Sequence, residues 1–139
     1  MFDSFAALFT HNRKNQPQGK IFATFNDRVL TYGQLDDLTA RGCTLFAKRG
    51  LKQGDRVVIL SRDDLAVTVL FFSCLRYGLT AVILNPDGGK AEHENLIRAA
   101  KPSLQMMDIE FIATLKPVAD QSAAISVGAT HKQAGMLDK

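Results

Sequence analysis

Cysteine is scarce in this sequence, and so is clustered charge of one sign. The two cysteines, Cys43 and Cys74, do not have the Cys-x-x-Cys spacing of zinc and redox motifs, so we expect free, buried thiols in a reducing compartment. The 17 basic and 14 acidic residues give a net charge of only +3 and are scattered along the chain. Without a basic stripe, the sequence argues against nucleic acid as a partner.

Long apolar runs are also missing. The most apolar window, Leu65–Leu75, is shorter than the roughly 20 residues that a membrane-spanning helix needs, so we expect a buried helix there and no transmembrane segment. The first residues do not show a basic region followed by an apolar run, which is the pattern of a secretory signal. Together these observations predict a cytoplasmic location.

What the sequence does have is the composition of a folded domain. Hydrophobic residues make up 46% of the 139 residues and charged residues 22%, which are ordinary values for a globular protein. This composition excludes disorder over most of the chain. One domain with a hydrophobic core is expected at this length.

The central stretch, residues 31–86, alternates helical and strand-like patterns. Val57–Leu60 and Thr80–Leu84 are apolar runs that each follow a helical run, as expected for strands of a sheet covered by helices on both faces. We therefore predict an α/β fold with a mainly parallel sheet flanked by helices. A hairpin of Ile21–Phe25 and Arg28–Leu30 is expected to make the sheet mixed.

Local signals mark where several elements begin and end. Thr31 and Gln34 have the spacing of a capping box at a helix start. Gly50 and Gly78 are expected to end helices, because glycine adopts the left-handed conformation at little cost. Asp63 is the expected N-cap of the apolar helix that follows it.

The ends of the chain are less regular than its centre. We assign residues 1–120 to the α/β unit and residues 121–139 to a possible short strand, Ala124–Val127, followed by a flexible tail. Residues 1–9 have apolar positions at helical spacing, and Ile109 is expected to face inward on another short helix.

The loop Asn85–Lys90 is the most tempting candidate for a phosphate site. It is rich in glycine and lies between a predicted strand and a predicted helix, where phosphate sites occur. However, it does not match Gly-x-x-x-x-Gly-Lys-Ser/Thr, and Ala91 follows the lysine. We therefore interpret it as a plain strand-to-helix connection.

Four aspartates follow predicted strands: Asp63, Asp64, Asp87 and Asp108. Carboxylates at that edge could bind Mg²⁺, as in a phosphoacceptor domain of the response-regulator kind. That hypothesis also needs a lysine and a hydroxyl after later strands, and an acidic pair after the first strand. Capping of helices by Asp63 and Asp87 is the better interpretation.

The histidines do not indicate a metal site. His11, His93 and His131 are dispersed, and Glu92–Glu94 places its three side chains on adjacent helical positions that point in different directions. We interpret that run as a solvated helix face. No Ser/His/Asp or Cys/His set can be assembled either, so we name no catalytic, cofactor-binding or metal-binding residue in this chain.

Three segments carry a family resemblance. Thr31–Leu35 has the pattern Thr-Tyr-x-x-Leu, Gly50–Val57 has Gly-x-x-x-Gly-Asp-Arg-Val, and Gly78 precedes a strand that ends in Asn85–Pro86. In this order and spacing they resemble the N-terminal segment of the adenylate-forming (AMP-binding) superfamily. That superfamily includes acyl-CoA synthetases, fatty acyl-AMP ligases, luciferases and the adenylation domains of peptide synthetases. The resemblance covers roughly residues 20–116.

This chain also departs from the family pattern. Ser61–Asp64 stands where the family has a Pro-Asn-Ser-like loop, and Tyr77 stands where it usually has alanine. The family's phosphate-binding signature, its later acidic ATP-binding motifs and its C-terminal catalytic lysine have no counterpart here. The resemblance therefore implies the N-terminal subdomain of an adenylate-forming enzyme, present as a fragment of a larger protein.

The resemblance also implies a function for the parent protein. With ATP and Mg²⁺ it would convert a carboxylic acid, fatty or aryl, into an acyl-adenylate and pass the acyl group to CoA or a carrier protein. The fragment alone is expected to be inactive and to hold no cofactor. Its partners would be the remaining subdomains of the parent, and an apolar surface that they normally cover would favour self-association. The alternatives are a stand-alone, non-enzymatic α/β binding module and a small phosphoacceptor domain.

Overall fold

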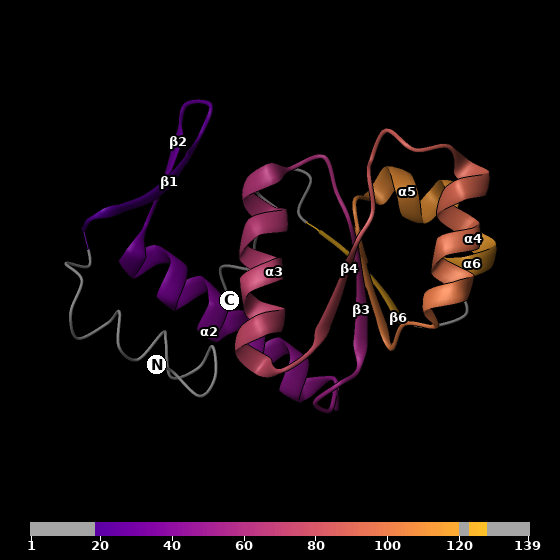
Figure 1. The fold of residues 1–139 in the computed structure, drawn as a ribbon, viewed down its shortest axis with the longest axis horizontal. Coiled ribbons are helices and arrows are strands. Elements are labelled where there is room, and N and C mark those ends of the chain that lie inside the picture. Colours follow the sequence, from indigo (N-terminus) through magenta and orange to yellow (C-terminus); the bar gives the residue numbers. More distant parts are fainter. Residues whose placement is uncertain (1–18, 120–122, 128–139) are drawn as a thin grey trace.

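The computed structural model describes residues 19–119 and 123–127. Within them lie a four-stranded sheet with helices on both faces and a separate hairpin (Figure 1). The elements run in the order β1 Ile21–Phe25, β2 Arg28–Thr31, α2 Tyr32–Lys48, β3 Arg56–Leu60, α3 Asp64–Tyr77, β4 Thr80–Ile83, α4 Lys90–Ala100, β5 Leu104–Met107, α5 Ile109–Thr114, α6 Lys116–Ala119 and β6 Ala123–Ser126. The last strand confirms the one predicted near residues 124–127. The helix predicted at residues 1–9 and the predicted tail lie outside the described residues.

The four-stranded sheet has the order β4-β3-β5-β6, and every neighbouring pair is parallel. Val57 of β3 pairs with Ala81 on one side and with Leu104 on the other. All residues of β5 are buried, as are all but the first of β3, which explains their apolar sequences. β4 lies at an edge, and its Ile83 is 47% exposed.

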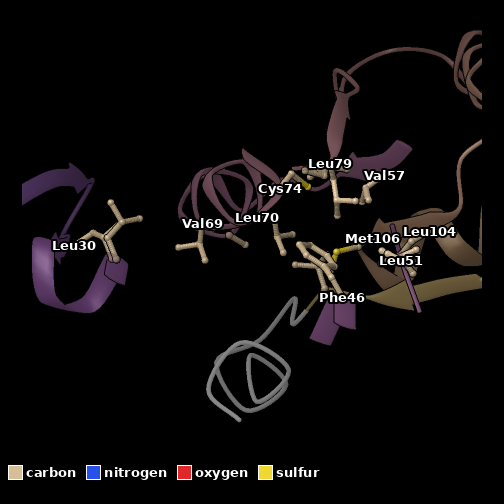
Figure 2. Packing of buried hydrophobic residues seen from close by; sticks show 14 residues of the cluster. Leu30, Phe46, Leu51, Val57, Val69, Leu70, Cys74, Leu79, Leu104 and Met106 are labelled. Carbon is tan, nitrogen blue, oxygen red and sulfur yellow. The ribbon is translucent and has the colours of Figure 1, made fainter. Parts of the chain in front are cut away.

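Side chains of β3 alternate between two cores. Val57 and Ile59 point into the core beneath α2 and α3, whereas Val58 and Leu60 point into the core beneath α4, α5 and α6. Figure 2 shows the first core, in which Phe46 of α2 reaches toward side chains of α3 and β5. Full burial of each such side chain contributes roughly 1.5–3 kcal/mol.

A glycine allows α2 and α3 to pack closely. A Cβ atom on Gly42 would lie 2.4 Å from Ser73 Oγ and 2.7 Å from Ser73 Cβ. Both residues are buried, so neither can turn toward solvent to avoid the contact. Arg76 of α3 adds a polar connection, because it lies 3.1 Å from the carboxylate of Asp36 on α2.

The helix ends predicted at Thr31, Gly50 and Gly78 are confirmed. Thr31 Oγ1 accepts a hydrogen bond from the Gln34 N–H at 3.1 Å, and the Thr31 N–H donates to Gln34 Oε1 at 2.9 Å, which completes the capping box. Gly50 and Gly78 follow α2 and α3 with φ angles of 73° and 95°, in the left-handed region that favours glycine.

The prediction that the hairpin joins the main sheet is wrong. Among residues 19–119 and 123–127, β1 and β2 pair only with each other, in antiparallel fashion, and they lie beside the start of α2, away from the four-stranded sheet (Figure 1). Phe22 of β1 packs edge-on against Tyr32 at 5.4 Å and against Phe72 at 5.5 Å, measured between ring centroids. The hairpin is thus held by helices α2 and α3. Helix α2, which follows β2 directly, leads the chain away from the hairpin before β3 begins.

The segment after β5 also differs from the prediction. Ile109 is 50% exposed, whereas Phe111 and Leu115 are buried and form the inner side of this segment. The short helix α6 was not predicted, and it contains Pro117 in its first turn, where proline is tolerated. Within residues 19–119 and 123–127, no helix is long and apolar enough to cross a membrane.

Candidate functional site

The carboxyl ends of β3, β4 and β5 meet at one edge of the sheet. In parallel α/β folds, ligands bind at such an edge where the winding of the chain reverses direction. Here the chain passes from β3 to β4 on one side and then crosses β3 to reach β5 on the other, so the reversal lies between the ends of β3 and β5. Ser61 and Asp108 occupy these two strand ends.

The Asp108 carboxylate is bonded within the protein. It is 5% exposed and accepts hydrogen bonds from Ser61 Oγ at 2.7 Å and from the Arg62 N–H at 2.8 Å. Ser61 Oγ in turn accepts from the Asp63 N–H at 3.0 Å. Polar groups of the protein that bond to one another therefore occupy the position between the ends of β3 and β5, where the winding of the chain reverses.

Arg62 joins the segments that follow all three strands. Its Nη1 lies 2.9 Å from Asp87 Oδ1, its Nε lies 3.1 Å from Glu110 Oε1, and its Nη2 donates to the carbonyl of Pro86 at 3.2 Å. The guanidinium also lies 5.3 Å from the centre of the Phe111 ring. The hydrogen bond with Asp87 is the main cause of a raised Arg62 pKa. Because these ion pairs are exposed, each adds little stability, but together they connect the loop after β4 and the start of α5 to one side chain in the loop after β3.

Asp63 connects this edge to the hairpin. Its carboxylate caps α3 by accepting from the N–H groups of Leu65 and Ala66, which confirms the predicted role, and it pairs with Arg28 of β2 at 2.8 Å. Partial burial acts to raise the pKa of Asp63. The hydrogen bonds from Arg28 and from the two backbone N–H groups outweigh that effect, and the pKa is lowered.

The predicted capping role of Asp87 is wrong. The N-cap of α4 is Gly89, which has no side chain to accept a hydrogen bond. The carboxylate of Asp87 is 80% exposed and pairs with Arg62 instead. Asp87 thus forms an ion pair with a neighbouring loop instead of capping α4. No local sequence pattern predicts this ion pair.

His93 is not on a solvated face, contrary to the prediction. It is 2% exposed, and its Nε2 lies 2.7 Å from the carbonyl oxygen of Asn85. The spacing in the sequence could have indicated this burial, because His93 lies four residues before the buried Ile97 on the inner side of α4. A Cβ on Gly88 would meet Glu92 Oε2 at 2.7 Å and His93 Nε2 at 3.0 Å. Gly88 therefore lets the loop fold closely over this histidine.

The remaining candidates do not converge on a site. Among the residues that the structure describes, no group of three or more His, Cys, Asp or Glu side chains could hold a metal ion. Cys43 and Cys74 are free thiols, and burial raises the pKa of Cys74 to about 12, so it stays protonated at neutral pH. Asp64 is exposed in the first turn of α3, and His11 and His131 lie outside the described residues.

A hollow of about 290 Å³ lies between β2, α2 and α3. Arg41 and Asp37, on its α2 side, form an ion pair at 3.1 Å across one helical turn. Its lining consists of Val29, Leu30, Gln34, Asp37, Leu38, Arg41 and Leu65. This lining of apolar side chains, one glutamine and one ion pair contains no cysteine, histidine or serine to act as a nucleophile or base.

Known proteins similar to this chain include ligases. Residues 9–138 match the family described as AMP-binding enzyme. The 4-hydroxybenzoate–CoA/benzoate–CoA ligase of Rhodopseudomonas palustris is 28% identical over 106 residues, which are 76% of this chain and 19% of that ligase. The p-hydroxybenzoic acid–AMP ligase FadD22 of Mycobacterium tuberculosis is 34% identical over 76 residues, which are 55% of this chain and 11% of that protein. The chain therefore spans about a fifth or less of the length of these curated relatives.

The fold agrees with the same assignment. The structure of ATP-bound MatB from Rhodopseudomonas palustris matches 96% of this chain and 28% of that one, with a TM-score of 0.80 at 19% identity. At this identity the likeness concerns the fold, which is that of the N-terminal domain of adenylate-forming enzymes. The family match extends over nearly the whole chain, and the parallel sheet, its helices and the three sequence segments all agree with it. This chain belongs to the AMP-binding enzyme family.

Proposed function

We propose that this chain is the N-terminal part of an ATP-dependent ligase that converts a carboxylic acid into an acyl-adenylate and transfers the acyl group to CoA or a carrier protein. The family match over residues 9–138 is the observation that supports this most strongly. The ligase relatives are several times longer than the part that aligns with this chain, which leaves room in a parent protein for the remaining subdomains.

Aryl acids are the substrate class that we propose first. Both relatives described above are named for benzoate or hydroxybenzoate. We assign no acyl pocket to the described residues that would refine this choice, so fatty acids remain in the test panel. CoA and a carrier protein are both retained as acceptors, since one relative is named as a CoA ligase and the name of the other, an AMP ligase, states no acceptor.

We propose that this part of the enzyme is scaffold and that other subdomains hold ATP and Mg²⁺. The described residues do not fit either group. Three of the four aspartates that would suit Mg²⁺ at this edge are bonded to Arg28, Ser61 and Arg62, and the fourth, Asp64, is exposed on α3. In the glycine-rich loop before α4, the N–H groups of Asp87 and Gly88 are bonded to Asn85, so these two groups are not free to bind a phosphate. No catalytic step is assigned to this chain.

Pyrophosphate exchange tests the proposal. The 139-residue chain is incubated with ATP, Mg²⁺, labelled pyrophosphate and a panel that contains benzoate, 4-hydroxybenzoate and a long-chain fatty acid, with a reaction lacking acid as control. A longer protein that contains this chain and the other subdomains is assayed in parallel. We expect exchange only with the longer protein, and most strongly with an aryl acid.

Two results would contradict the proposal in different ways. Exchange by the 139-residue chain alone would refute its role as inactive scaffold. A source protein that runs at 15.3 kDa on an immunoblot, with no larger form, would favour a stand-alone binding module instead. We also propose a cytoplasmic location, in keeping with two free thiols, and fractionation of the source cells tests it.

A further inference from the structure

Basic residues that are separate in the sequence lie together at the amino-terminal edge of the four-stranded sheet. Helices α2 and α3 end at this edge and strands β3 and β4 begin there, at the bottom of the view (Figure 1). Arg56, at the start of β3, donates from its guanidinium to the carbonyls of Ala100 and Lys101, which brings the end of α4 to the same edge. The exposed basic residues here, called the basic edge below, are Lys48, Arg49, Lys52, Arg56 and Lys101.

Neighbouring carboxylates do not neutralise the basic edge. In the described parts of the chain the ion pairs join other residues, such as Arg62 with Asp87, and none of them involves the basic edge. Asp55 is the one acidic residue in the loop between α2 and β3, and its carboxylate accepts a hydrogen bond from the Lys52 N–H at 2.9 Å. The edge therefore presents five cations beside one carboxylate.

The helix ends offset only part of this charge. Cations are favoured near the C-terminus of a helix, which accounts for the position of Lys48 in the last turn of α2. Each helix end carries the equivalent of about half a negative charge, so the ends of α2, α3 and α4 together with Asp55 offset roughly half of the five positive charges. A positive field remains at the basic edge.

The carboxyl edge of the sheet has the opposite character. Arg62 and Lys90 lie there among a larger number of carboxylates, those of Asp63, Asp64, Asp87, Asp108 and Glu110. The five residues of β3 separate the two edges by about 17 Å, roughly twice the distance over which physiological salt screens a charge. The molecule should therefore approach a negatively charged partner with the basic edge first.

The side chains at the basic edge favour a broad anionic surface as that partner. Protein interfaces have an apolar core with aromatic anchors, and nucleic-acid sites for single strands use aromatic rings on which bases stack. Tyr77, at the end of α3, is only partly exposed and donates from its hydroxyl to the Leu51 carbonyl at 2.9 Å. Among residues 19–119 and 123–127 the large exposed apolar side chains lie away from this edge: Ile21, Val29, Ile83, Leu96 and Ile109.

A membrane surface with anionic lipids needs only the charges that the basic edge supplies. Each lysine or arginine held near such a surface strengthens binding without any apolar contact. The cations come from three segments, at the ends of α2 and α4 and in the loop before β3, so they are spread over a face and do not line a groove. We propose that the basic edge binds the surface of membranes that contain anionic lipids, by electrostatic attraction and without insertion of apolar side chains.

Co-sedimentation with lipid vesicles tests the proposal. The 139-residue chain is mixed with vesicles of phosphatidylcholine alone, or of phosphatidylcholine and phosphatidylserine in equal parts, at low and at physiological salt. Neither ATP nor a carboxylic acid is present, so the result does not depend on the ligase function proposed above. We expect binding to the anionic vesicles only, and a steep loss of binding as salt is added.

Charge reversals locate the binding surface. One cation near an anionic membrane changes binding about fivefold, so Lys48→Glu and Lys52→Glu, which each change the charge by two, should each weaken vesicle binding about 25-fold. Lys90→Glu is the matched control, because Lys90 is exposed at the start of α4, on the carboxyl edge, and the change in charge is the same. This control should bind like the unmodified chain. Circular dichroism establishes that each variant is folded.

Four results would overturn the proposal. The first is equal binding, or none, to the two kinds of vesicle. The second is an equal loss of binding in Lys52→Glu and Lys90→Glu, because net charge and not the basic edge would then be responsible. The third is stronger inhibition by sodium phosphate than by sodium chloride at equal ionic strength, which would indicate a site for free phosphate. The fourth is tighter binding to duplex DNA than to the anionic vesicles, which would assign the basic edge to nucleic acid.

Discussion

Replacing Gly42 with alanine sets two effects of similar size against each other. Alanine is favoured over glycine inside a helix by about 1 kcal/mol. The new Cβ, however, would lie 2.4 Å from Ser73 Oγ and 2.7 Å from Ser73 Cβ, whereas carbon atoms prefer separations of about 3.5–4.0 Å. Helices α2 and α3 would have to separate by about 1 Å, and overpacking of this kind costs about 1–3 kcal/mol. Gly42→Ala is therefore expected to lower the free energy of unfolding by about 1 kcal/mol.

The residue at position 73 should decide the sign of this effect. Ser73→Gly removes both close contacts, so in that background Gly42→Ala is expected to raise the free energy of unfolding by about 1 kcal/mol. Ser73→Ala is the matched control, because it removes the hydroxyl that donates to the Val69 carbonyl but keeps the Cβ that is 2.7 Å away. In that background Gly42→Ala should remain destabilising.

Urea unfolding followed by circular dichroism gives these free energies, and the double-mutant cycle isolates the contact between the two helices. If Gly42→Ala has the same sign and size in the unmodified and the Ser73→Gly backgrounds, α2 and α3 do not meet at this glycine, and the reasoning is refuted.

Three further predictions concern single side chains. Asp63→Ala should lower the free energy of unfolding by about 1–2 kcal/mol at neutral pH through loss of the α3 cap, whereas Asp63→Asn should keep the cap. Because the pKa of Asp63 is lowered from 3.8 in the folded state, its charge stabilises the protein above that value, and this contribution is lost as the pH falls through the folded pKa. Urea titrations from pH 7 downward should show the loss in the unmodified protein and not in Asp63→Asn, and parallel curves would contradict it. Cys74, with a pKa of about 12, should resist alkylation until the protein unfolds, and half-buried Cys43 should be labelled first. Mass spectrometry measures the order of labelling, and labelling of Cys74 before Cys43 would refute the packing. Asp108→Ala should lower the free energy of unfolding by about 2–4 kcal/mol, because a buried hydroxyl and an N–H lose their acceptor. Asp87→Ala removes an exposed ion pair and should change the melting temperature little. Equal losses of stability in the two variants would contradict the difference in burial.

The elements of the fold could be predicted because their signals are local. The capping box needs only Thr31 and Gln34, three residues apart, and Gly78 ends α3 through its own backbone conformation. Val57–Leu60 is apolar without interruption because both of its faces are covered, so the sequence also indicated a parallel strand inside the sheet. The resemblance carried by residues 31–86 led to the family, which the match over residues 9–138 confirms.

What could not be predicted depends on which distant segments meet. Arg62 pairs with Asp87, 25 residues later, and with Glu110, 48 residues later, and neither spacing is a motif. The hairpin strands were predicted, but pairing rules alone do not say whether a hairpin joins a sheet or packs on helices. His93 was misplaced because histidine suits both water and a buried hydrogen bond, so only the fold decides between them.

The strand order has a consequence for how the sheet assembles during translation. β3 is synthesised first among the four strands and ends up between β4 and β5. Each later strand has its partner already present in the emerging chain: β4 adds to one side of β3, β5 adds to the other side, and β6 adds to β5. The sheet can therefore grow outward from its centre as the polypeptide leaves the ribosome, and after β3 none of these four strands has to wait for a neighbour that is still to be made.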